Sequence, residues 1–172
     1  ARRADESLMA ILEEAGGKPE RPDPVAAWIG AVHDGRPHAP TPPGPLRAGD
    51  RELLPMMASA GADERVARLL DAGIPIDSPG LEGAAIHYAC MWGRASTLRL
   101  LLARGADPEH LTDLGRPLGY VAWGSGALDP GGERADGYLQ CAETLLALGV
   151  AIQQGYADMA SDEIAALIEA RL

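Results

Sequence analysis

The sequence predicts an all-α protein, a solenoid of stacked helix-turn-helix repeats joined by short extended loops. Residues 52–61 and 84–93 share one pattern of apolar residues and end on Gly61 and Gly93, which lie 32 positions apart. An internal repeat of this length is typical of solenoids. Alanine, leucine and glycine dominate the composition and phenylalanine is absent. Small side chains suit closely packed helices better than a sheet, so we expect helices throughout.

Each copy of the repeat continues into a second helix with one apolar stripe. The stripe consists of Val66, Leu69 and Leu70 in the first copy and of Leu98, Leu101 and Leu102 in the second. Gly73, Gly105 and Gly149 close the copies, and we expect them to end the helices in a left-handed cap. Pro75 and Pro108 follow soon after two of these caps, where they predict short extended turns.

A third copy opens at residues 116–123 and closes at residues 145–149. Its closing glycine lies 44 residues beyond Gly105, so about a dozen residues are inserted, at 125–137. Loops of this length are usually either functional or disordered. The insertion is therefore a lid over one face of the stack, a linker or a disordered loop.

The flanking segments predict the ends of a single domain, residues 1–172. Residues 1–35 form an N-terminal cap in this interpretation, with a second helix at 6–15 and a first helix at 24–34. The proline-rich segment 36–50 cannot be helical and is a linker, a second part of the lid or a disordered segment. Residues 150–172 form a C-terminal capping helix that Ser161 begins, with its apolar face inward; that face consists of Ile164, Leu167 and Ile168.

The middle copy resembles the ankyrin repeat in two motifs, IHYAC at residues 86–90 and LLARGAD at residues 101–107. The resemblance implies about three repeats over residues 51–149 between degenerate caps. Pro55 and Gly119 stand where His87 stands in the middle copy, so the outer copies are degenerate. A glycine inside a helix costs about 1 kcal/mol relative to alanine. Gly119 therefore indicates either space for a ligand or decay of the repeat.

The resemblance also implies a binding groove on the concave surface formed by the first helices. The residues expected to face this groove stand at the end of the first helix of a copy, just before its middle glycine; they are Met91, Trp92 and Trp123. Tyr88 and Tyr120 lie one helical turn earlier on the same face. We expect the two tryptophans to lie side by side, and likewise the two tyrosines. The alternative is that the tyrosines pack under the neighbouring hairpin loops.

Two functions follow from this groove. The first is a recognition module that binds a protein partner, whose basic surface would complement the acidic chain. The second is a small cofactor-independent enzyme or binder of an apolar small molecule, performing an acid/base dehydration, cyclisation or isomerisation. The side chains available for proton transfer are His87, Tyr88, Tyr120, His110 and Asp113. The resemblance implies instead that the histidine bonds backbone groups and joins adjacent repeats.

The composition argues against several other classes. Fifteen basic and 25 acidic residues give a net charge of −10, which disfavours nucleic acid as a partner. No apolar run is long enough for a membrane span and the start lacks the apolar region of a signal peptide, so we expect a cytoplasmic protein. Cys90 and Cys141 occupy apolar helix positions, typical of free thiols. The four histidines lack the spacing of metal ligands, and no motif predicts a cofactor.

Overall fold

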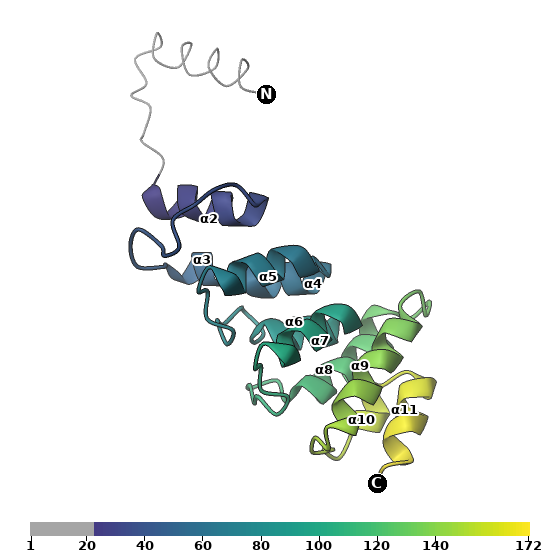
Figure 1. Cartoon of the computed structure of the whole chain (residues 1–172). Coiled ribbons are helices and arrows are strands. Elements are labelled where there is room, and N and C mark those ends of the chain that lie inside the picture. The colour runs from purple at the N-terminus through teal and green to yellow at the C-terminus, as the bar shows by residue number, and fades with distance from the viewer. Residues whose placement is uncertain (1–22) are drawn as a thin grey trace, which may run out of the picture.

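The computed structural model describes residues 23–172, which form successive layers of paired helices (Figure 1). The helices are α2 (Pro24–Asp34), α3 (Ala48–Arg51), α4 (Leu53–Ala60), α5 (Asp63–Asp71), α6 (Ala85–Met91), α7 (Ala95–Ala103), α8 (Pro117–Trp123), the π-helix η1 (Gly124–Leu128), α9 (Ala135–Ala147), α10 (Tyr156–Met159) and α11 (Asp162–Glu169). These residues contain no strand, which confirms the predicted all-α class for this part of the chain. The helix expected at 6–15 lies outside the described residues.

The helices pack in two rows. Helices α4, α6, α8 and α10 contact one another in order along the first row, and α5, α7, α9 and α11 do so along the second. Helix α2 packs against α5 and so extends the second row. The predicted helix at residues 24–34 is therefore present, but it lies in the second row and not in the first, where the first helix of a repeat belongs.

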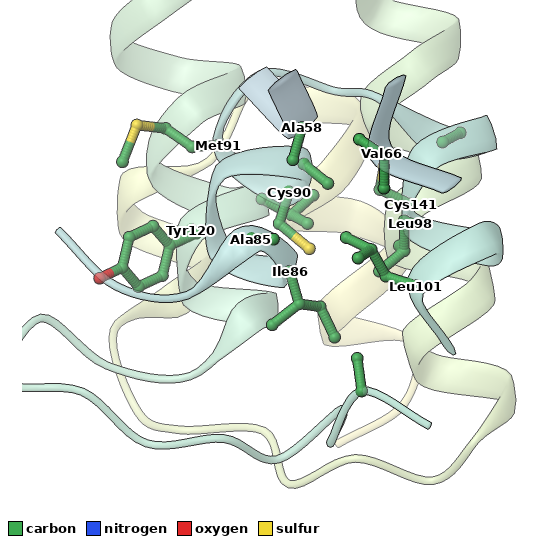
Figure 2. Packing of buried hydrophobic residues seen from close by; sticks show 14 of the residues in the cluster. Ala58, Val66, Ala85, Ile86, Cys90, Met91, Leu98, Leu101, Tyr120 and Cys141 are labelled. Atoms are coloured by element: carbon green, nitrogen blue, oxygen red, sulfur yellow. The ribbon is translucent and has the colours of Figure 1, made fainter. Parts of the chain in front are cut away.

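The core lies between the two rows and follows most of the predicted stripes, although Leu70 and Leu102 are only half-buried. Val66, Leu98 and Leu101 are fully buried, and Figure 2 shows them grouped beside the first-row residues Ile86 and Cys90. Small side chains such as those of Ala58, Ala85 and Ala89 are also fully buried, which lets first-row helices approach closely. Both cysteines are free and buried in this core.

Glycines in the left-handed region end several helices, as predicted. The φ angles of Gly73, Gly105 and Gly149 are 86°, 91° and 75°. Tight turns then project from the stack at residues 78–84 and 110–116, which we call the hairpin loops. Each turn is held by one isolated β-bridge, Gly80 with Gly83 and Thr112 with Gly115.

The C-terminal region differs from its prediction. Residues 150–172 form two helices, α10 and α11, which together make a fourth layer (Figure 1). Ser161 precedes α11, but its side chain makes no capping hydrogen bond, and the helix ends at Glu169. Ile164 and Ile168 are buried as expected, whereas Leu167 is only half-buried. A helix as short as α10 has too few residues to show helical periodicity, which explains why the sequence pattern did not reveal it.

The proline-rich segment 36–50 also differs from its prediction. Its last residues are helical because α3 begins at Ala48. The Trp28 indole Nε1 donates a hydrogen bond to the Ala39 carbonyl at 2.8 Å, and the His38 ring packs edge-on against the same indole. The segment therefore lies against α2, at the opposite end of the stack from α8 and α10, and not over their first-row face as a lid.

Candidate functional site: a cleft on the first-row face

An apolar cleft of about 300 Å³ opens on the first-row face of the last three layers. It is lined by residues of α6, α8, α10 and both hairpin loops: Glu82, Met91, Leu114, Gly119, Tyr120, Trp123, Tyr156 and Met159. Met91 and Tyr120 are buried, whereas the rim is open: Trp123, Met159 and Leu114 are 41%, 43% and 67% exposed. In Figure 2, Met91 and Tyr120 lie on the side of the stack opposite Val66, Leu98 and Leu101. The cleft thus faces away from the core between the rows.

Three of the five predicted groove residues, Met91, Tyr120 and Trp123, come together in this cleft. Tyr88 and Trp92 do not line it. Trp92 is half-buried, and the Arg134 guanidinium lies 5.1 Å from the centre of its ring. The expected tryptophan pair is therefore not part of the cleft, because the insertion supplies a different partner for Trp92.

Both tyrosines hold the first hairpin loop through the backbone of Glu82. The Tyr120 hydroxyl donates to the Glu82 carbonyl, and the Tyr88 hydroxyl accepts from the Glu82 N–H at 3.2 Å. The Tyr120 hydroxyl also lies 2.9 Å from the Thr112 hydroxyl in the second hairpin loop. Burial raises the pKa of Tyr120, and the carboxylates of Glu82 and Asp113 raise it further. The alternative expectation for the tyrosines, packing under the hairpin loops, describes these contacts.

His87 is completely buried and both its ring nitrogens are engaged by backbone groups. Its Nδ1 accepts from the Ala84 N–H at 3.2 Å, so the proton sits on Nε2, which donates to the His110 carbonyl at 2.9 Å. Burial lowers the pKa of His87, so the ring is neutral at pH 7. Within this layer His87 joins the start of α6 to the next hairpin loop, as the resemblance implied.

The five residues of the proton-transfer hypothesis are not assembled around the cleft. Only Tyr120 lines it, and its hydroxyl is already bonded to the Glu82 carbonyl. Tyr88, His87, His110 and Asp113 lie outside the lining. Nor do residues 23–172 contain a group of three His, Cys, Asp or Glu side chains able to hold a metal ion.

Sequence reasoning missed four lining residues, and Gly119 explains how one of them, Tyr156, was missed. A Cβ atom at Gly119 would lie 2.8 Å from Cε1 of Tyr156, so the glycine allows the Tyr156 ring to pack directly on α8. Close packing on Tyr156 is therefore a third explanation for Gly119, beside the ligand space and the repeat decay that the sequence suggests. A glycine inside a helix signals such an approach, but it does not name the residue that approaches. The other missed residues are Glu82, Leu114 and Met159.

The insertion is folded against the stack. Its first part forms η1, directly after Trp123, and a Cβ at Gly124 would lie 2.2 Å from the Met91 carbonyl oxygen. Arg134 closes the segment by donating to the Leu128 carbonyl at 2.7 Å and by pairing with the buried carboxylate of Asp129. The close approach of Gly124 to Met91 places η1 against α6, and the Arg134 contacts close the insertion on itself.

The comparisons with known proteins agree with this architecture. The family model for the ankyrin repeat matches residues 84–113, which cover α6, α7 and most of the second hairpin loop. The human protein "tRNA endonuclease ANKZF1" is 35% identical over 127 residues, or 69% of this chain. The matched part is 17% of that relative's length, so the chain spans a small part of it. Among residues 23–172, no helix is long and apolar enough to cross a membrane. The chain therefore contains an ankyrin repeat, which the family model matches at residues 84–113.

Proposed function

We propose that this chain is a recognition module that binds a protein partner in the cleft. The observation that carries the proposal is the exposure of Trp123, Met159 and Leu114 around a preformed apolar hollow. Exposed apolar residues gathered in one place commonly mark an interaction site. The ankyrin repeat itself points to protein binding.

The structure of the cleft suits binding at little entropic cost. Its floor is already fixed, because Met91 and Tyr120 are buried and the Tyr120 hydroxyl is bonded to both hairpin loops. Preorganisation of this kind reduces the ordering that a partner must otherwise compensate. Trp123 is the side chain that we expect to contribute most, because tryptophans dominate the energetics of many interfaces.

Affinity capture from an extract of the native cell tests this proposal. The bait proteins are the wild type, a double variant with Trp123→Ala and Met159→Ala, and Leu148→Ala as the control. Leu148 is 57% exposed but follows the end of α9 in the second row, so its loss removes a comparable apolar side chain away from the cleft. We expect one set of proteins to be captured by the wild type and the control and lost with the double variant. Equal capture by all three baits would contradict the proposal.

A further inference from the structure

We propose that the occupant of the cleft is an amphipathic helix of a partner protein, with apolar side chains on one face and lysines or arginines beside them. This inference rests on the proposed function and names the chemistry of the partner. Three features of the site support it: the extent of its apolar rim, the charge around that rim, and the absence of a free strand edge.

The apolar surface extends beyond the cleft along the hairpin loops. Leu81 and Leu111 are 92% and 61% exposed at these loops, and Leu114 joins the second loop to the cleft. Trp123 and Met159 continue the exposed apolar surface on the helix side. A single buried side chain of a partner would leave most of this surface in water. A helix with an apolar stripe several turns long would cover more of it.

The charge around the cleft is negative and unpaired. Glu82 lines the cleft, Asp113 precedes Leu114, and Asp158 precedes Met159; all three are exposed and make no ion pair with the described residues. The sequence after residue 105 has three basic side chains and no lysine; they are Arg116, Arg134 and Arg171. The first two are paired with Glu109 and Asp129, so they do not neutralise the rim. A partner with basic residues beside its apolar stripe is complementary to this surface.

The backbone of the site favours a helix over an added strand. A peptide that binds as a strand needs a sheet edge with free N–H and C=O groups. Residues 23–172 have no strand. The bridging backbone groups of the hairpin loops are already hydrogen-bonded within each loop, where the Gly80 N–H donates to the Gly83 carbonyl and the Thr112 N–H donates to the Gly115 carbonyl. A helix in a groove needs only side-chain contacts, which this site offers.

Fluorescence anisotropy with synthetic peptides tests the inference. The probe is a fluorescein-labelled peptide of about 18 residues, or five helical turns, with leucines on one face and lysines on the other. Two comparison peptides have the same length: one carries glutamates in place of the lysines, and one has the leucine–lysine sequence scrambled so that no apolar face forms. We expect the leucine–lysine helix to bind at least tenfold more tightly than either comparison peptide, and more weakly in high salt.

Matched variants separate the rim from the overall charge of the chain. The rim variant combines Glu82→Gln with Asp113→Asn, and the control combines Glu143→Gln with Glu169→Gln, two exposed residues of second-row helices. Both variants remove the same charge. We expect the rim variant to bind the leucine–lysine helix roughly three- to tenfold more weakly, since exposed charge pairs contribute modestly, and the control to stay within about twofold of the wild type.

The possible outcomes distinguish this inference from the proposed function. Equal binding of the glutamate or scrambled peptide, equal effects of the rim and control variants, or no binding of the leucine–lysine helix would overturn the basic amphipathic helix. Trp123→Ala tests the cleft itself, and its exposed side chain can be removed without opening the core. If peptides bind but Trp123→Ala weakens none of them, the cleft is not the site and the proposed function fails as well.

Discussion

The replacement His87→Ala tests whether the buried histidine holds two layers of the stack together. The side chain is fully buried, and its loss leaves the Ala84 N–H and the His110 carbonyl without their partner. Each buried polar group left unsatisfied costs about 1–3 kcal/mol, and the missing ring adds a cavity. We expect the free energy of unfolding to fall by about 3–5 kcal/mol.

Urea unfolding followed by circular dichroism measures this change through the transition midpoint and its slope. His38→Ala is the matched control, because His38 is exposed and its ring contacts Trp28 of α2, outside the layers that His87 joins. Its effect should remain below about 1 kcal/mol, as is usual for surface substitutions. A loss below about 1 kcal/mol for His87→Ala would refute the conclusion that both hydrogen bonds stabilise the fold.

Three further predictions concern titration, packing and thiol reactivity. Burial lowers the pKa of His87 in the folded chain, so stability is fully present above the unfolded value of about 6.5 and falls as the pH drops below it. The slope is at most about 1.4 kcal/mol per pH unit, and His87→Gln should lack this component in urea titrations at several pH values. Gly119→Ala should destabilise the chain by roughly 1–3 kcal/mol, because its Cβ meets the Tyr156 ring. The control Gly49→Ala has no atom within 4 Å of its Cβ and should leave the stability unchanged. Thermal unfolding measures both variants, and equal shifts of their Tm would contradict this packing argument. Burial raises the pKa of the Cys90 thiol well above its usual value and raises the pKa of the Cys141 thiol to about 12. Neither thiol should therefore react with iodoacetamide at pH 8 until urea unfolds the chain, and rapid alkylation seen by mass spectrometry would argue against their burial.

The parts of the fold that the sequence predicted are those with a repeated physical cause. The stripe of Val66 and Leu69 recurs as Leu98 and Leu101 because both second-row helices bury one face against the same kind of neighbour. The closing glycines, such as Gly105, could also be predicted from the sequence, because few other residues adopt the positive φ of a left-handed helix cap. Helix α10 is too short to show periodicity, so the sequence pattern predicts a single helix in the fourth layer.

The lining of the cleft followed only in part from the repeat register. Repeat register correctly brought Met91, Tyr120 and Trp123 to one face. The remaining wall depends on Tyr156 and Met159, which belong to the layer that the sequence did not reveal. The repeat register also predicts Trp92 in the groove, but the Trp92 ring instead makes a cation–π contact with Arg134 of the insertion. Such long-range partners cannot be deduced from the spacing within one repeat.

The most direct test of the proposed binding cleft uses the methionine methyl groups as reporters. Met91 and Met159 line the cleft, whereas Met56 and Met57 lie on α4, where Met56 is 54% exposed and serves as the surface control. The chain is labelled with ¹³C at the methionine methyls and titrated with the leucine–lysine helix while methyl spectra are recorded. We expect the Met91 and Met159 signals to shift together until the site is saturated and the α4 signals to stay in place. Shifts at Met56 and Met57, with Met91 and Met159 unchanged, would contradict it.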